Sequence, residues 1–125
     1  MSKLILEDET YAIRGACFEA YKEKGSGYLE EVYQECLEIE LQLQAIPYIA
    51  QPGLDMTYKG RPMQKKYVPD LIAYGQVIVE LKAVDELHEK HRAQILNFLH
   101  STGLKIGLLV NFGHFPRIKI ERFAL

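Results

Sequence analysis

The chain carries PDLIAYGQVIVELK at residues 69–82, and this segment predicts a β-hairpin. Two apolar runs of strand character, 71–74 and 77–79, flank Gly75, a residue that tight turns favour. A turn centred on Gly75 places Asp70 opposite Glu80, and directly opposite residues of an antiparallel pair project to the same face. Side chains alternate along a strand, so Lys82 shares that face with Glu80. Asp70, Glu80 and Lys82 are therefore predicted to converge.

Such a cluster suits metal-assisted phosphoryl chemistry. Two carboxylates held side by side repel each other and favour a hard divalent cation, and Mg²⁺ takes oxygen ligands while keeping several waters. A bound cation lowers the pKa of a water and neutralises charge that develops on a phosphoryl group. Lys82 would stabilise the same charge or orient the attacking water. The alternative is a surface hairpin whose Glu80 and Lys82 form an exposed ion pair of little energetic value.

Pro69-Asp70, followed about ten residues later by Glu80-Leu81-Lys82, resembles the active-site signature of the PD-(D/E)xK nuclease superfamily. A second motif, Gly-x-x-Glu-x-x-Tyr at residues 27–33, resembles the one that names the GxxExxY protein family, a small bacterial and archaeal branch of that superfamily. The order of segments also resembles this family from about Thr10 to the C-terminus. The resemblance implies a restriction-endonuclease-like fold and a nuclease-type site, without naming a substrate.

The predicted elements follow an α-α-β-β-β-α-β-β order. Apolar periodicity and stop signals predict helices at about 8–24, 29–44 and 87–102. The remaining apolar segments predict strands at 47–58, 67–74, 77–83, 105–111 and 117–123. A long helix between two strands allows them to lie parallel. We therefore predict an α/β fold in which helices flank a mixed sheet, as one PD-(D/E)xK nuclease-like domain spanning residues 1–125.

Glu30 is the predicted third carboxylate. In the second helix the apolar residues recur at the spacing of one buried face. Glu30 falls at the border of that face beside Tyr33 and Leu37, whereas Glu31 points to solvent. The Gly-x-x-Glu-x-x-Tyr resemblance also places its glutamate at position 30. The alternative is a solvated neighbour of the core.

The third predicted helix carries two further candidates. Gln94-Ile95-Leu96-Asn97-Phe98 resembles the Gln-x-x-x-Tyr element of exonuclease-like members of the superfamily, with Phe98 where a tyrosine is usual. Gln94 would orient the Lys82 amine, a substrate phosphate or a metal-bound water, or it is a surface amide. His91 would act as a general base or proton shuttle, or it caps the helix.

Composition limits the partners. The chain has 125 residues, 48% of them hydrophobic, which is enough for the core of one domain. The net charge is −2, from 15 basic and 17 acidic residues, so strong nonspecific nucleic-acid binding by bulk charge is excluded. A local contact is predicted at a basic segment around Gly60, formed by Lys59, Arg61, Lys65 and Lys66. The alternative is a solvated hairpin tip.

The sequence predicts a cytoplasmic protein. Cys17 and Cys36 have no partner motif, so we expect reduced thiols and no zinc site. The N-terminus lacks the apolar core of a signal peptide, and no apolar run approaches the length that crosses a membrane.

Three functional hypotheses follow. The first is a Mg²⁺- or Mn²⁺-dependent nuclease that cuts DNA, with RNA as the less favoured substrate. Under it Asp70 and Glu80 hold the metal ion, and the Leu81 carbonyl adds an oxygen. Glu30 binds directly or through water, and Lys82 stabilises the transition state. The second is a catalytically silent module on the same fold that binds nucleic acid or protein. The third treats the charged cluster as an ion network inside a homodimer.

Overall fold

The computed structural model describes residues 4–125. Within this range the helices are α1 (Glu7–Lys24), α2 (Glu30–Leu43) and α3 (Glu89–Thr102). The strands are β1 (Tyr48–Ala50), β2 (Thr57–Tyr58), β3 (Arg61–Pro62), β4 (Leu71–Ala73), β5 (Val77–Lys82), β6 (Ile106–Asn111) and β7 (Lys119–Ala124). The three predicted helices are confirmed with ends that differ by one or two residues.

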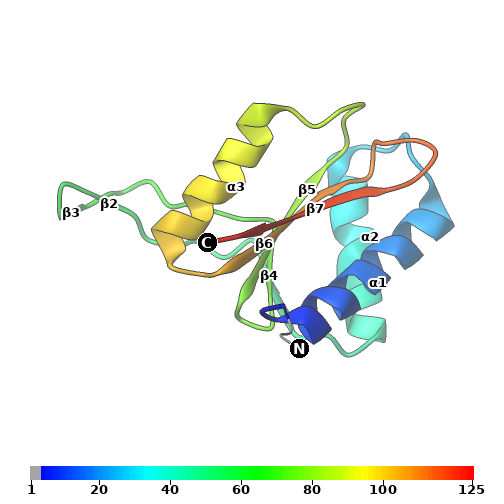
Figure 1. The fold of residues 1–125 in the computed structure, drawn as a ribbon, viewed down its shortest axis with the longest axis horizontal. Helices are drawn as coiled ribbons and strands as arrows, with labels where there is room; N and C mark the ends of the chain where they lie inside the picture. The colour runs from blue at the N-terminus through cyan, green and yellow to red at the C-terminus, as the bar shows by residue number, and fades with distance from the viewer. Residues whose placement is uncertain (1–3) are drawn as a thin grey trace.

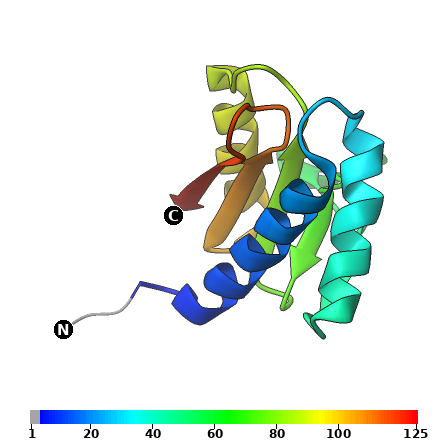
Figure 2. The same ribbon diagram turned by 90° about the vertical axis from the view of Figure 1, so that its right-hand side faces the viewer.

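A mixed sheet of five strands forms the centre, in the order β1-β4-β5-β6-β7. Only β5 and β6 are parallel among these neighbours, and α3 is the crossover that joins them. Helices α1 and α2 cover one face of the sheet, and α3 lies on the other (Figures 1 and 2). The predicted α/β architecture is therefore confirmed.

The hairpin of β4 and β5 has the register that the sequence predicts. Leu71 pairs with Val79, Ile72 with Ile78 and Ala73 with Val77. Tyr74 and Gly75 turn the chain with φ of 56° and 64°, in the left-handed region that glycine adopts without strain. The N–H of Gln76 closes the turn by donating to the carbonyl of Ala73 at 3.0 Å.

Alternation along β5 divides its side chains between two cores. Val77, Val79 and Leu81 pack with residues of α1 and α2, while Ile78 packs with Leu99 of α3. Glu80 and Lys82 have the parity of Ile78. They therefore lie on the α3 side of the strand, at the end where β5 leaves the sheet.

The predicted strand at 47–58 is only partly confirmed: β1 covers residues 48–50, whereas residues 54–58 do not belong to the main sheet. Leu54 forms an isolated bridge with Tyr67, and β2 pairs only with β3. Figure 1 shows this small hairpin projecting away from the five-stranded sheet. The physical reason is its exposure: residues 57–66 are all exposed, so they bring no apolar face that the sheet could bury.

Cys17 and Cys36 are both free, as predicted, and Cys17 is buried. Burial raises the pKa of the Cys17 thiol to about 12, so this thiol is an unreactive part of the core. Within residues 4–125, none of the helices has the length and apolar character needed to cross a membrane.

Candidate functional site

Asp70 and Glu80 meet where the β4–β5 ladder ends. The N–H of Asp70 donates to Glu80 Oε1 at 2.9 Å, and the N–H of Leu81 donates to Asp70 Oδ2 at 2.7 Å. Beyond the Leu71–Val79 pair, the carboxylates of Asp70 and Glu80 thus accept the hydrogen bonds that main-chain N–H groups donate. Each carboxylate is held by one oxygen, and the other oxygen accepts no hydrogen bond from the part of the chain that the structure describes.

Burial makes both carboxylates costly to ionise. Glu80 is 7% exposed, and its pKa is raised to about 7, mainly by desolvation and further by the charge of Asp70. The pKa of Asp70 is also raised by burial, against the lowering effects of the Leu81 N–H and of Lys82. A cation between the two carboxylates would offset this cost.

Lys82 is half-buried beside the pair. Its positive charge lowers the pKa of Asp70, of Glu80 and of Glu30, so the ammonium lies within electrostatic reach of all three. Among residues 4–125 it forms no ion pair. The convergence of Asp70, Glu80 and Lys82 that the sequence predicts is therefore observed, and the ammonium is free to contact a ligand.

Glu30 is the first residue of α2 and lies near Asp70. It lines a cavity of about 400 Å³ together with Asp70, Gln34 and Gln51. Partial burial raises the pKa of Glu30, the charge of Lys82 lowers it, and the charge of Asp70 raises it. The second helix thus brings a third carboxylate to the rim of the cavity, on the side of the sheet that α2 covers.

Gln34 anchors this helix to the hairpin. Its Nε2 donates to the main-chain oxygen of Asp70 at 3.1 Å and to Glu38 at 3.0 Å. The sequence does not predict a role for Gln34, because a glutamine one turn after Glu30 matches no motif of its own. Only the packing of α2 against β4 gives it a partner.

The donor set suits a hard cation that keeps much of its water. It consists of oxygen ligands alone, as Mg²⁺ and Mn²⁺ prefer, and each buried carboxylate has a free oxygen. Within residues 4–125, however, no group of three or more His, Cys, Asp or Glu is arranged to hold a metal ion. The role of Glu30 as a metal ligand, directly or through water, stays a prediction, and so does that of the Leu81 carbonyl.

Tyr67 completes the carboxylate pair and was also missed. Its hydroxyl donates to Glu80 Oε1 at 3.2 Å, and its ring stacks on Phe98 of α3 with the planes 22° apart. Tyr67 is 6% exposed. In the sequence it lies outside the Asp70–Lys82 segment, and only the packing of α3 against the chain before β4 brings its hydroxyl to the site.

A second cavity, of about 510 Å³, opens on the α3 side of Lys82. It is lined by Lys82, Lys90, His91, Ala93, Gln94, Asn97 and Phe98. Gln94 is exposed and lines the same cavity as Lys82, as its predicted role requires. Its catalytic role stays a prediction.

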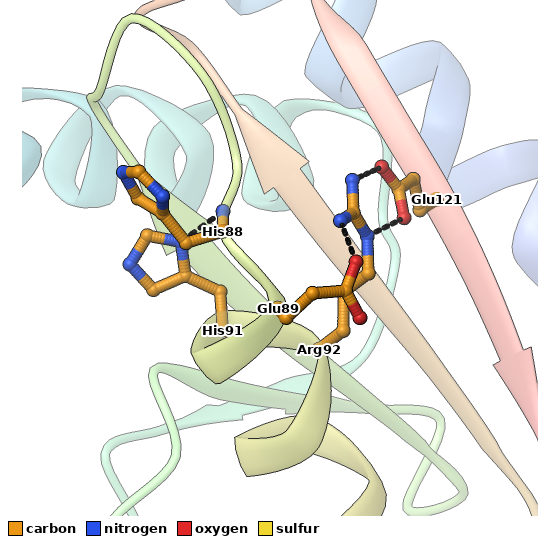
Figure 3. Close-up of polar contacts among 5 residues, drawn as sticks. All are labelled: His88, Glu89, His91, Arg92 and Glu121. Carbon is orange, nitrogen blue, oxygen red and sulfur yellow. Dashed lines mark hydrogen bonds and ion pairs between the residues drawn. The ribbon is translucent and has the colours of Figure 1, made fainter.

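His91 caps its helix. Its Nδ1 accepts the N–H of His88 at 3.1 Å, the N-terminal contact drawn in Figure 3. Partial desolvation and the nearby charge of Lys82 lower the pKa of His91, so it is neutral at pH 7. The capping alternative for His91 is thus confirmed.

The four basic residues for which the sequence predicts nucleic-acid contacts line neither of these two cavities. Lys59, Arg61, Lys65 and Lys66 are all exposed. Lys66 pairs with Asp55, and Lys59 lies 5.5 Å from the centre of the Tyr58 ring. Lys59 and Arg61 belong to the hairpin of β2 and β3, whereas Lys65 and Lys66 lie in the chain between that hairpin and Tyr67. The nucleic-acid contacts of all four residues stay a prediction.

Comparison with known proteins identifies the family. Residues 7–123 match the model of the PD-(D/E)XK nuclease superfamily. A solved structure described as the crystal structure of SSO0001 has a similar fold, with a TM-score of 0.61 and 17% sequence identity. The match covers 75% of this chain and 48% of that chain, so this chain spans about half the length of the solved one. The search of the curated proteins found no match.

Nucleases of this superfamily generally use divalent metal ions. The narrower GxxExxY assignment stays a prediction from the sequence. With the superfamily model matching almost the whole chain and the signature residues gathered at one end of β5, the protein belongs to the PD-(D/E)XK nuclease superfamily.

Proposed function

We propose that the protein hydrolyses phosphodiester bonds of nucleic acid, with DNA as the substrate, in a reaction that depends on Mg²⁺ or Mn²⁺. The observation that carries this proposal is the hydrogen bond from the Asp70 N–H to Glu80 beside Lys82, which forms no ion pair among residues 4–125. The protein would serve as a cytoplasmic enzyme.

Asp70 and Glu80 would hold the metal ion through their free oxygens, with the Leu81 carbonyl as a further ligand. A metal ion bound there would supply a water of lowered pKa and polarise the phosphoryl group. Glu30, at the rim of the neighbouring cavity, would accept a hydrogen bond from a water of this site.

Lys82 would act on the substrate itself. Its ammonium donates to a non-bridging oxygen of the scissile phosphate and stabilises the charge that grows there in the transition state. Gln94, which lines the same cavity as Lys82, would orient the Lys82 amine or a metal-bound water. The exposed Lys59, Arg61, Lys65 and Lys66 would contact the backbone of a longer substrate.

One observation favours a second function, a silent binding module. Phe98 stands where the resembled element carries a tyrosine, so its ring stacks on Tyr67 and brings no hydroxyl to the site. Such a module would bind nucleic acid at the same cavities without cutting it.

The test is cleavage of plasmid, linear and single-stranded DNA with Mg²⁺ or Mn²⁺. We expect Asp70→Asn and Lys82→Met to lower the rate by about 10²-fold or more, because each removes a group that acts on the developing charge. Lys105→Gln is the control, since Lys105 lies before β6, at the opposite end of the sheet from Lys82. Equal cleavage by all variants would reveal a contaminant and overturn the proposal.

Calorimetry separates the two functions. A nuclease requires metal binding that is lost in Glu80→Gln. Metal-dependent binding without cleavage in any DNA form would favour the silent module, and no metal binding would contradict the proposed site.

A further inference from the structure

The cavity on the α3 side of Lys82 differs in charge from the one on the α2 side. The α2-side cavity is lined by Glu30, Glu31 and Asp70. The α3-side cavity is lined by Lys82 and Lys90, and the described residues of its wall include no carboxylate. The end of β5 therefore separates an acidic hollow from a basic one, and a ligand that crosses it meets opposite charge on the two sides.

Both lysines are available to a ligand. Neither Lys82 nor Lys90 forms an ion pair within residues 4–125. The neighbouring Arg92, in contrast, forms ion pairs. It contacts Glu89 at 2.6 Å and Glu121 of β7 at 2.7 Å, and Figure 3 shows its guanidinium directed at both carboxylates. The fold thus neutralises Arg92 and leaves two positive charges at the cavity.

The α3 wall carries hydrogen-bond donors at regular spacing. Lys90, Gln94 and Asn97 follow the i, i+4, i+7 pattern that places side chains on one face of a helix. His91 contributes as well: its Nδ1 accepts the His88 N–H, so the proton of the neutral ring is on Nε2. The wall is therefore rich in donors, which suits an anionic ligand with several acceptor oxygens.

Phe98 lines the same cavity, and one face of its ring is already covered because it stacks on Tyr67. The charge and hydrogen-bond donors of the wall therefore outweigh the aromatic surface that it offers to a nucleobase. These features suit a phosphate group.

We infer that the α3-side cavity binds a phosphate group of the nucleic-acid substrate, gripped by Lys90, Gln94 and Asn97 next to Lys82. The inference rests on the proposed function, because it takes the substrate to be a nucleic acid. The substrate backbone then runs across the end of β5, with one phosphate at the carboxylate pair and its neighbour against α3.

The test is equilibrium binding of a short single-stranded DNA, labelled at its 3′ end, in the presence of Ca²⁺ and without turnover. We expect Lys90→Gln to weaken binding about tenfold, because a charge-assisted hydrogen bond is lost. The slope of log Kd against log salt should also fall by about 0.7, the value for one phosphate contact on a single strand. Gln94→Glu, which adds a negative charge with almost no change of shape, should weaken binding further.

Lys105→Gln is the matched control, since it removes the same charge at the other end of the sheet and should leave the affinity unchanged apart from a small long-range effect. Comparing 5′-phosphate with 5′-hydroxyl DNA distinguishes the source of the phosphate. A loss confined to 5′-phosphate DNA identifies a terminal phosphate, and an equal loss identifies the internal backbone.

Unchanged affinity and salt slope in both Lys90→Gln and Gln94→Glu, or no DNA binding by the unmodified protein, would overturn the inference. Failure of the proposed function has a different signature. The unmodified protein would then bind DNA with these salt slopes but would not cleave it with Mg²⁺ or Mn²⁺.

Discussion

The main-chain N–H of Asp70 donates to the side chain of Glu80 across the end of the hairpin, at 2.9 Å. The bond holds the Glu80 carboxylate against the main chain of Asp70, although desolvation and the charge of Asp70 both disfavour the ionised form of Glu80. This arrangement makes the stability of the metal-free protein sensitive to pH.

We expect the metal-free protein to lose stability as pH rises from about 4.5 to about 7. The pKa of Glu80 is near 4.5 in the unfolded chain and about 7 in the folded one. In this window the folded state binds more protons, so the free energy of unfolding falls by up to about 3 kcal/mol from this group. The shift of Asp70 acts in the same direction. Thermal unfolding measured across this pH range checks the prediction, and Glu80→Gln should flatten the dependence of stability on pH. A flat profile for the unmodified protein would contradict the burial of this charge.

We expect Mg²⁺ or Mn²⁺ to raise the unfolding temperature more at pH 8 than at pH 5. At pH 8 Glu80 is mostly ionised and can bind the cation, whereas at pH 5 a proton competes for the same oxygen. Saturation at a hundred times Kd stabilises by about 2.7 kcal/mol. Differential scanning calorimetry with and without metal measures the effect. An equal shift at both pH values would indicate binding elsewhere.

We expect Tyr67→Phe to destabilise the fold by about 1 kcal/mol. The substitution keeps the stacking on Phe98 and removes only the hydroxyl that donates to Glu80. Because that bond lowers the pKa of Glu80, the variant should also show a higher Glu80 pKa in NMR titration of the carboxyl carbon. Tyr58→Phe is the control, since Tyr58 is 64% exposed. Identical titration curves would show that the hydroxyl does not act on Glu80.

We expect Gly113→Ala to destabilise the protein by several kcal/mol. A Cβ at Gly113 would lie 2.4 Å from the main-chain nitrogen of Val84, and main chain cannot move aside cheaply. The loop after β6 is tied to the chain that follows Lys82, because Asn111 Oδ1 accepts from Val84 and from Gly113. Urea unfolding measures the loss.

Gly15→Ala provides the opposite control for this variant. Gly15 lies in α1 with no atom within 4 Å of an added Cβ, so alanine should stabilise the helix by about 1 kcal/mol. Equal effects at the two glycines would mean that the loop after β6 yields to the added carbon.

Local rules account for the part of the site that the sequence predicts. A turn at Tyr74-Gly75 and the period-2 alternation of strands are enough to set the pairing of β4 with β5. They therefore also set which face Asp70, Glu80 and Lys82 share. The period of 3.6 residues likewise predicts which residues of α2 are buried, and it brings Glu30 to the rim of the site.

Packing between distant segments decided the rest. Tyr67 reaches Glu80 because α3 holds its ring through Phe98, and Gln34 reaches Asp70 because α2 lies against β4. Lys90, Gln94 and Asn97 line one cavity with Lys82 only because the crossover helix α3 packs on the sheet. Nearest-neighbour periodicity and turn geometry carry no information on such contacts, because they depend on how helices are placed on the sheet and on which side chains the resulting interfaces bury.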